Sequence, residues 1–282
     1  MSKKVLVVAG PTASGKTALG ISLALERGGE IVSADSMQIY RGMDIGTAKA
    51  SPEEQAAVPH HMIDVVNPEE DFSVAQYVEG AAACCEDIFR RGKLPIIVGG
   101  TGLYIDSLLS GRDFGARAED GALRTELNAK YEEIGGEAML QELSSFDPAR
   151  AAKLSPADKK RIVRAFEVYI LTGETISHHD ERTRLTPPRY EAEWIVLNPE
   201  RSELYRRINE RVDAMIASGL VEEVKALLEH VPSSATSMQA IGYKEIVSHL
   251  KGELSLAEAL ELIKLSSRRY AKRQVTWFRK YM

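Results

Sequence analysis

Short apolar runs alternate with amphipathic segments over the first hundred residues. The runs over Lys4–Ala9, Glu30–Ala34 and Leu94–Val98 are rich in valine or isoleucine, which is typical of strands buried on both faces of a parallel sheet. Helical spacing of apolar residues predicts helices over Lys16–Arg27 and from about Ser73 to Arg91, each followed by glycine. Because strand and helix alternate through short glycine-rich joints, the pattern predicts right-handed βαβ units and a doubly wound parallel α/β sheet.

The pattern changes after about Asp113. From there to about Pro188 the sequence is helical in character and has no valine-rich run, and Glu193–Leu197 then predicts a return to the sheet. The remainder predicts helices over Arg201–Ser218, Val221–Glu229, Tyr243–Leu250 and Ser255 to about Lys280. We therefore expect an α/β core of residues 1–112 and 189–282, interrupted by a mostly helical insertion of residues 113–188 and ending in a helical C-terminus.

Composition narrows the class of protein. The chain has 282 residues, 44% of them hydrophobic and 27% charged, as in an ordinary globular protein. A net charge of −5 means that a nucleic-acid partner would need a local basic surface. The two cysteines are adjacent, which is poor geometry for a disulfide, and no apolar stretch is long enough for a membrane span. We expect a cytoplasmic monomer that does not enter membranes.

The sharpest local signal is a phosphate-binding loop. It fits G-x-x-x-x-G-K-[ST] and lies between a predicted buried strand and a predicted helix, over Gly10, Pro11, Thr12, Ala13, Ser14, Gly15, Lys16 and Thr17. Such a loop turns successive backbone N–H groups toward phosphate oxygens at the positive end of the helix. Lys16 adds a charge for the terminal oxygens, and the Thr17 hydroxyl is placed to ligate Mg²⁺.

The loop shows what is bound but leaves the reaction open. The run LPIIVGGTG ends without the acid that hydrolytic NTPases use to hold Mg²⁺ and orient water. An acid follows the neighbouring strand instead, as Asp35, at the sheet edge where ligands of α/β proteins bind. Asp35 could accept a proton from an attacking nucleophile, or it could simply cap the turn before Ser36. This pattern indicates group transfer to an acceptor, which a small-molecule kinase would also satisfy.

Several strings together resemble one family. GPTASGKT is accompanied by SADSMQIYRGMDIGTAK (33–49), VPHHMIDVVNPEEDFSVAQY (58–77) and VGGTGLYIDSLL (98–109). Further along come DKKRIVRAFEVYILTGETIS (158–177), RINERVDAMIASGLVEEV (207–224), QAIGYKE (239–245) and RRYAKRQVTWFRK (268–280). In this order, over nearly the whole chain, they resemble the tRNA dimethylallyltransferases, also called isopentenyl-tRNA transferases. Eukaryotic members of this family carry a zinc-finger extension, and this chain ends at Met282 without one. We therefore expect the bacterial type.

The resemblance implies a reaction and a catalytic set. The family transfers a dimethylallyl group from dimethylallyl diphosphate to N6 of the adenosine 3′ of certain tRNA anticodons, and its phosphate loop holds the diphosphate of that donor and not ATP. The target adenine is flipped out of the anticodon loop. Asp35 would be the general base, while Lys16, Mg²⁺ at Thr17 and an arginine would neutralise the leaving diphosphate. Arg211 is the best match for that arginine, with Arg207 as the alternative.

The resemblance also implies residues that contact tRNA. Asp35 and the three residues after it match family positions that face the flipped adenine. Thr101 matches an active-site position of the family that contacts tRNA. The full set is Asp35, Ser36, Met37, Gln38, Thr101, Arg124, Lys159, Lys160, Arg161, Ile162, Val163 and Arg164. The alternative to a tRNA contact at Thr101 is that the residue simply packs in a turn. The alternative for the charged run from Lys159 is a helix face exposed to solvent.

The C-terminal segment adds a basic stripe. Between Ile263 and Met282 there are seven Lys or Arg residues and no acid, with aromatic residues interleaved, and such a stripe can contact an RNA backbone. We expect Trp277 within it to be buried. His60 and His61 are adjacent and cannot readily face one metal, so we expect them to be structural. Prenylation of free adenine nucleotides, small-molecule phosphorylation and non-catalytic RNA binding remain the alternative functions.

Overall fold

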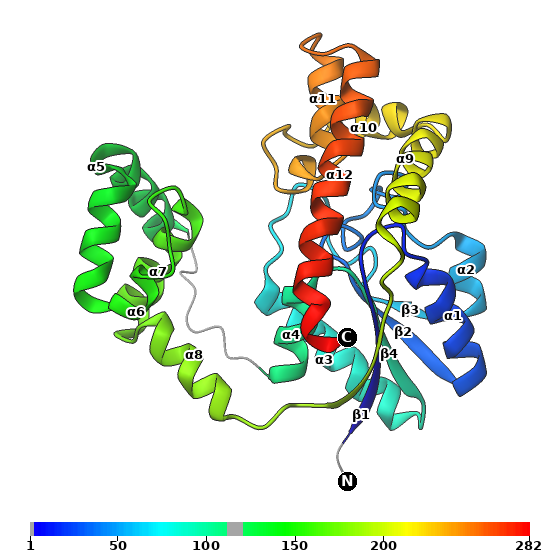
Figure 1. Cartoon of the computed structure of the whole chain (residues 1–282), viewed down its shortest axis with the longest axis horizontal. Coiled ribbons are helices and arrows are strands. Elements are labelled where there is room, and N and C mark those ends of the chain that lie inside the picture. The colour runs from blue at the N-terminus through cyan, green and yellow to red at the C-terminus, as the bar shows by residue number, and fades with distance from the viewer. Residues whose placement is uncertain (1–2, 112–120) are drawn as a thin grey trace. The chain divides into compact units, whose positions relative to one another are not determined.

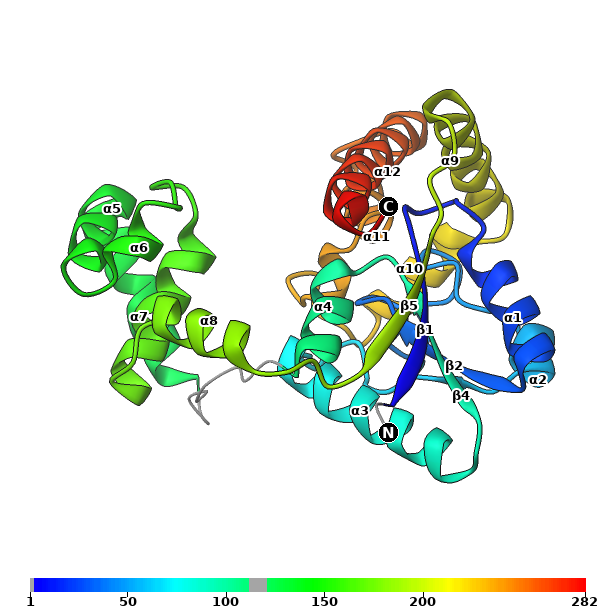
Figure 2. The ribbon, with the colours of Figure 1, turned by 60° about the horizontal axis from the view of Figure 1, so that its bottom comes forward.

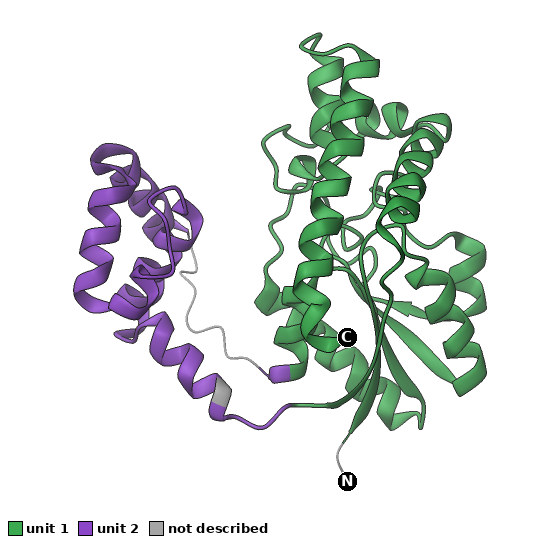
Figure 3. Cartoon of the chain, in the orientation of Figure 1, with its two compact units in different colours: residues 1–109, 189–282 green, residues 110–188 purple. Residues whose placement is uncertain are grey.

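The computed structural model describes residues 3–111 and 121–282. The chain divides into two compact units, one of residues 1–109 with 189–282 and one of residues 110–188 (Figures 1 and 3). The boundary expected between residues 112 and 113 falls outside the described residues. Each unit has its own core, so each is described separately.

Unit 1 is built on a five-stranded parallel sheet. The strands are β1 (Lys4–Ala9), β2 (Gly29–Ala34), β3 (His60–His61), β4 (Leu94–Gly99) and β5 (Glu191–Val196), in the spatial order β3-β2-β4-β1-β5. All neighbouring pairs are parallel, with Ala9 and Ala34 both in register with Gly99. The doubly wound α/β prediction is confirmed. The carboxyl ends of β1, β2 and β4 therefore lie together, and the loops that leave them meet at one edge of the sheet.

Helices cover both faces of this sheet (Figure 2). Helix α1 (Lys16–Arg27) lies with α2 (Pro52–Ala57) on one face, where Leu23 packs against Leu6 and Ile96 in an apolar cluster. Helices α3 (Val74–Arg90) and α4 (Gly102–Ser110) lie on the other face. The sequence pattern had not predicted α2 or β3, because six and two residues are too short to show a period.

The C-terminal half of unit 1 is helical. It comprises α9 (Arg201–Ala217), α10 (Leu220–Leu228), α11 (Tyr243–Leu250) and α12 (Leu256–Phe278), with 3₁₀ turns η1 (Ser237–Gln239) and η2 (Arg279–Tyr281). These helices share a second core with the segment after β2, in which Tyr40 and Met43 are fully buried beside Val224 and Tyr243. This packing ties the segment that follows Asp35 to the C-terminal helices.

Unit 2 is a helical bundle with a core of its own. Its helices are α5 (Ala122–Phe146), α6 (Pro148–Ala151), α7 (Lys159–Thr172) and α8 (Ile176–Leu185), and α5 is broken by non-helical backbone at Gly135. Leu127, Met139, Leu143 and Phe166 form the centre of its core. Over ranges 3–111 and 121–282, neither unit has a helix long and apolar enough to cross a membrane.

Candidate active site

The phosphate loop connects β1 to α1 at the carboxyl edge of the sheet. Gly10 has φ 149° and a Cβ there would lie 2.6 Å from the carbonyl oxygen of Leu197, so only glycine fits. Gly15, at φ 89°, is the N-cap of α1 and lets the loop enter the helix. The loop therefore ends with the first amides of α1 free to face an anion, at the positive end of the helix.

Two cations face the space beyond this loop. The Lys16 ammonium donates to the carbonyl oxygen of Pro11 at 2.7 Å, and the guanidinium Nη2 of Arg211, from α9, lies 3.4 Å from the carbonyl oxygen of Thr47. Burial and the nearby Arg211 charge lower the pKa of Lys16 to about 8, although Asp35 opposes the shift. Burial likewise lowers the pKa of Arg211, again opposed by Asp35. A like-charged, desolvated pair of this kind is stabilised by a bound anion.

Asp35 is the first residue after β2 and faces these cations. Its Oδ1 accepts a hydrogen bond from the backbone N–H of Met37 at 2.9 Å, so Asp35 also caps the turn that follows it. Gln38, at the end of the turn, donates to the carbonyl oxygens of Thr47 and Ala48 at 3.3 and 3.2 Å. The turn-capping and ligand-facing interpretations of Asp35 are therefore compatible.

The loop after β4 is hydrogen-bonded to the turn that carries Asp35. Thr101 Oγ1 accepts from the backbone N–H of Ser36 at 3.1 Å, and the Thr101 N–H donates to the carbonyl oxygen of Ala34 at 3.0 Å. Tyr270 of α12 lines the same site, and burial raises the pKa of its phenol to about 12, so it stays protonated. Thr101 thus fixes the turn that carries Asp35.

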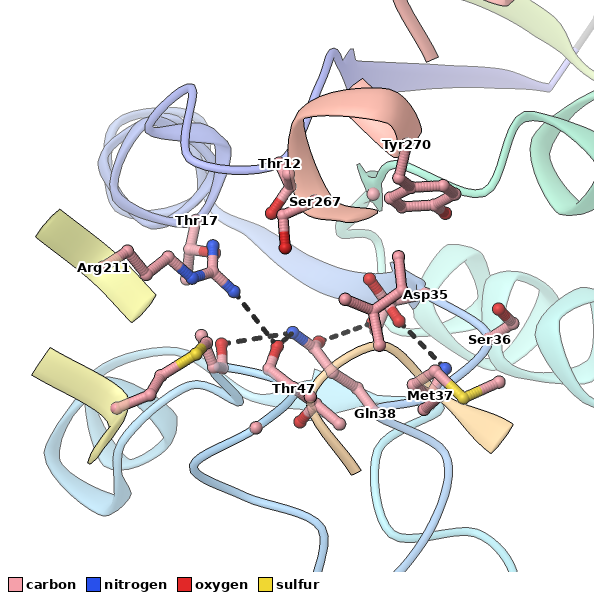
Figure 4. Close-up of a pocket in the computed structure, with 18 of the residues that line it drawn as sticks. Thr12, Thr17, Asp35, Ser36, Met37, Gln38, Thr47, Arg211, Ser267 and Tyr270 are labelled. Carbon is pink, nitrogen blue, oxygen red and sulfur yellow. Dashed lines mark hydrogen bonds between the residues drawn. The ribbon is translucent and has the colours of Figure 1, made fainter. Parts of the chain in front are cut away.

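These residues enclose a cavity of about 430 Å³ within unit 1 (Figure 4). Its polar wall carries Lys16, Asp35, Gln38 and Arg211, and apolar groups complete it, among them Ile31, Ile63, Val98, Met215 and Ile241. A second cavity of about 820 Å³ is lined by Ala13, Ser14 and Gly15 of the phosphate loop and shares Lys16, Thr17 and Arg211 with the first. The two cations and the Thr17 hydroxyl therefore stand where the two cavities meet.

Comparison with known proteins identifies the family. The model described as IPP transferase matches residues 38–281, and the one described as isopentenyl transferase matches residues 3–64. A tRNA dimethylallyltransferase of Geobacillus thermodenitrificans is 50% identical over 282 residues, covering 100% of this chain and 89% of that protein. This chain belongs to the IPP transferase family. One of Carboxydothermus hydrogenoformans is 49% identical over 280 residues, with coverage of 99% and 90%.

Solved structures agree with this family. The tRNA isopentenylpyrophosphate transferase of Bacillus halodurans matches with a TM-score of 0.72 at 44% identity, over 99% of this chain and 87% of that one. A eukaryotic dimethylallyltransferase, described as acting on tRNA, matches with a TM-score of 0.86 at 32% identity, over 98% and 70%. The predicted family and its P-loop α/β fold are confirmed.

Within this IPP transferase, the two candidate arginines have different surroundings. Arg207 is paired through its Nε with Glu203 at 2.6 Å, one turn earlier on α9. Arg211 lines both cavities, while the neighbouring acids of α9 have other partners: Glu210 pairs with Arg206 and Asp213 with Lys264. The geometry thus places Arg211, and not Arg207, beside Lys16 and Asp35.

The candidate tRNA residues of unit 2 fall into two groups. Arg124 and Arg164 both pair with Glu167 at 2.6 Å, and Lys159 pairs with Glu132 at 2.5 Å. Lys160 and Arg161 are exposed, and Arg161 lies 3.7 Å from Asp158. Two residues of the predicted segment need correction. Ile162 and Val163 lie in the core of unit 2, 0% and 3% exposed, because they occupy the apolar face of α7. Their side chains cannot reach a ligand at the surface.

The C-terminal stripe also differs from expectation. Trp277 is 42% exposed, so the prediction that it is buried was wrong. The indole ring of Trp277 packs against Gly102, where a Cβ would lie 2.3 Å from the ring. The indole Nε1 donates to Asp106 Oδ2 at 3.0 Å. Lys280 pairs with the same carboxylate at 2.7 Å. Part of the basic stripe therefore anchors the end of α12, while Arg273 lines the cavity.

Three further residues line the cavity that were not predicted to do so from the sequence, namely His60, Thr47 and Gln274. His60 was expected to be structural, and its Nδ1 does lie 2.7 Å from the carbonyl oxygen of Val58, but its buried Nε2 has no partner among the described residues. Thr47 supplies the carbonyl oxygen that orients both Arg211 and Gln38. Gln274, in the string RRYAKRQ, reaches the phosphate loop. Only the family strings could have pointed to these positions, because none of the three has a distinctive local pattern.

The site is chemically suited to a divalent cation held jointly with a substrate. Across the described parts of the chain there is no group of three or more His, Cys, Asp or Glu side chains that would hold a metal by themselves. Thr17 nevertheless presents a hydroxyl where the two cavities meet, and Asp35 presents a carboxylate in the first cavity. Mg²⁺ is commonly held by one or two such protein groups together with substrate phosphates, so these residues fit it.

Proposed function

We propose that this protein transfers a dimethylallyl group from dimethylallyl diphosphate to N6 of the adenosine adjacent, on the 3′ side, to the anticodon of certain tRNAs. The observation that carries this proposal is that Lys16 and Arg211 line both cavities while Asp35 faces them from the first. One cavity lies beyond the phosphate loop and the other holds the Asp35 turn. This arrangement suits a donor and an acceptor that approach from opposite sides.

On the donor side, the chain neutralises the leaving group. The diphosphate lies against the amides at the start of α1, with Lys16 and Arg211 beside its oxygens. Thr17 would hold Mg²⁺ together with the diphosphate, and the ion would neutralise part of the charge that builds up on the leaving group. The five-carbon chain extends from the diphosphate into the first cavity, where Ile63, Met215 and Ile241 accommodate it and exclude water from the allylic carbon.

On the acceptor side, the chain removes a proton. The N6 amine attacks C1 of the dimethylallyl group, the bond from C1 to the diphosphate oxygen breaks, and diphosphate leaves with that electron pair. The proton lost from N6 passes to the Asp35 carboxylate. Asp35 is held for this by the Met37 amide, and Thr101 fixes the turn behind it. The flipped adenine lies against Ser36, Met37 and Gln38.

Contacts to the rest of the anticodon stem-loop come from exposed cations. In unit 2, Lys160 and Arg161 are exposed at the start of α7 and can reach RNA phosphates. Arg124, Arg164 and Lys159 would first have to exchange a carboxylate partner for a phosphate. A free nucleotide would need none of these cations, so tRNA is the acceptor proposed.

Mass spectrometry of nucleosides tests the proposal. Unmodified tRNA, or AMP, is incubated with the protein, Mg²⁺ and dimethylallyl diphosphate, and a parallel reaction contains ATP in place of the prenyl donor. The proposal predicts an adenosine that carries one five-carbon unit, formed in tRNA and not in AMP. Prenylated AMP without prenylated tRNA would refute the acceptor, and phosphate transfer from ATP would refute the donor.

A further inference from the structure

Gln274 joins two loops that leave different strands of the sheet. Its side chain projects from α12 and is 5% exposed. The Oε1 atom accepts from the backbone N–H of Thr12 in the phosphate loop at 2.8 Å, and Nε2 donates to the carbonyl oxygen of Gly100, after β4, at 3.0 Å. Both ends of this buried amide are thus satisfied by backbone groups.

The connection continues as far as the candidate base. Gly100, whose carbonyl oxygen accepts from Gln274, is followed directly by Thr101. Thr101 accepts from the N–H of Ser36, the residue directly after Asp35. The connection therefore runs from the phosphate loop, through Gln274 and the backbone of Gly100 and Thr101, to the Asp35 turn.

The backbone at Gly100 is shaped around Gln274. A Cβ added to Gly100 would lie 2.2 Å from Gln274 Nε2, and the next nearest atom outside that side chain is 3.5 Å away. Gly100 is not among the glycines with positive φ, so an alanine there would be strained by this contact and not by its backbone conformation. The methyl group that Gly100→Ala introduces would therefore act on the site by displacing Gln274.

We infer that Gln274 is a positioning residue that holds the phosphate loop in register with the Asp35 turn, so that C1 of the donor faces N6 of the acceptor. The inference rests on the proposed function, because it takes the two loops as the donor and acceptor sides of one transfer. Misplacement of reacting groups by about 1 Å can cost on the order of 100-fold in rate. Gln274 touches backbone groups of both loops and has no role in the bond-making step itself.

A double-mutant cycle tests this inference. Gln274→Ala and Gly100→Ala are each expected to lower kcat by about 10- to 100-fold, with KM for tRNA within about threefold of the wild-type value. Because Gly100→Ala acts through Gln274, it should cost little more in the Gln274→Ala background. Asp106→Asn is the matched control, since it loosens the end of α12 at Trp277 without touching either loop, and it should leave kcat nearly unchanged.

The outcomes separate the inference from the proposed function. Thermal unfolding of each variant, followed by circular dichroism, shows that kcat is compared between folded proteins. The inference is overturned if both single variants keep wild-type kcat, if their costs simply add, or if Asp106→Asn loses as much as Gln274→Ala. If the wild-type protein itself forms no prenylated tRNA, the proposed function fails, and this result is distinguishable from a failure of the inference alone.

Discussion

The candidate ligand-binding cations of the two units have different partners. In unit 1, Lys16 and Arg211 face each other and Asp35 across a cavity, and their nearest hydrogen-bond acceptors are backbone carbonyl oxygens. In unit 2, Arg124 and Arg164 share the buried carboxylate of Glu167. The first arrangement leaves positive charge for a ligand, whereas the second uses it within the protein. Similar residues in one sequence can thus be prepared for binding in one region and for folding in another.

The difference has an energetic basis. Burial lowers the pKa of both Lys16 and Arg211, and repulsion by the nearby Arg211 charge lowers the pKa of Lys16 further. A diphosphate would relieve this repulsion. Burial alone would raise the pKa of Glu167, but hydrogen bonds from Arg124 and Arg164 together hold it below its ordinary value. The Glu167 carboxylate is therefore already paired within the protein.

The largest effect expected is that of Asp35→Asn. The amide cannot accept the N6 proton, so kcat should fall by about 10²- to 10⁴-fold, while the donor Kd changes little. Single-turnover prenylation and donor titration measure the two quantities. Asp213→Asn, on the surface of α9, serves as the control. Equal turnover in Asp35→Asn and wild type would remove Asp35 as the base.

Arg211→Met should have the next largest effect. It removes a charge that stabilises the leaving diphosphate, so kcat/KM for the donor should fall by about 10²- to 10³-fold. Arg207→Met, one turn away on the same helix, removes an arginine paired with Glu203 and should cost less than about threefold. Steady-state kinetics over a range of donor concentrations would show this difference. The reverse ranking would assign the diphosphate to Arg207.

Proton uptake tests the state of Lys16. With a pKa of about 8, Lys16 is partly neutral at pH 8 in the free protein, and a bound diphosphate favours its charged form. Binding at pH 8 should take up on the order of half a proton, and affinity should fall as the pH rises above about 8. Calorimetry in buffers of different ionisation enthalpy measures the uptake. Lys16→Met should abolish it, and uptake that persists in this variant would exclude Lys16 as its source.

In unit 2 the expected effect is on stability. Glu167→Gln leaves two arginines without their shared carboxylate and should lower the free energy of unfolding by about 3 kcal/mol. In the wild type, the pKa of Glu167 is lowered on folding, so its contribution is present at neutral pH and is lost as the pH falls below about 4. Thermal denaturation at pH 7 and pH 4 would measure both. A stability unchanged by the substitution would mean that the cluster is not structural.

Asp106→Asn should have the smallest effect. Asp106 anchors the end of α12 through Trp277, Lys280 and Tyr281. These groups are partly exposed to solvent, so the loss should be about 1 kcal/mol. Chemical denaturation would detect a shift of this size, and a loss as large as that of Glu167→Gln would contradict this ranking.

Sequence reasoning succeeded where a local pattern has a single physical cause. The apolar run Lys4–Ala9 and the glycines at positions 10 and 15 define a strand and a phosphate loop, and the structure has both. It failed where tertiary packing decides. The exposure of Trp277 depends on where α12 passes Gly102, and the burial of Ile162 depends on which face of α7 meets α5. The positions of Thr47 and Gln274 depend on loops far apart in sequence.

The central claim is that the junction beside Lys16 and Arg211 holds the diphosphate of a prenyl donor. Calorimetric titration of the protein with dimethylallyl diphosphate, in the presence of Mg²⁺, tests it most directly. The wild type is compared with Arg211→Met and Arg124→Met, and ATP is titrated as the competing ligand. The account predicts binding that is at least about tenfold weaker in Arg211→Met, unchanged in Arg124→Met and tighter than that of ATP. Tighter binding of ATP, or equal binding by wild type and Arg211→Met, would contradict it.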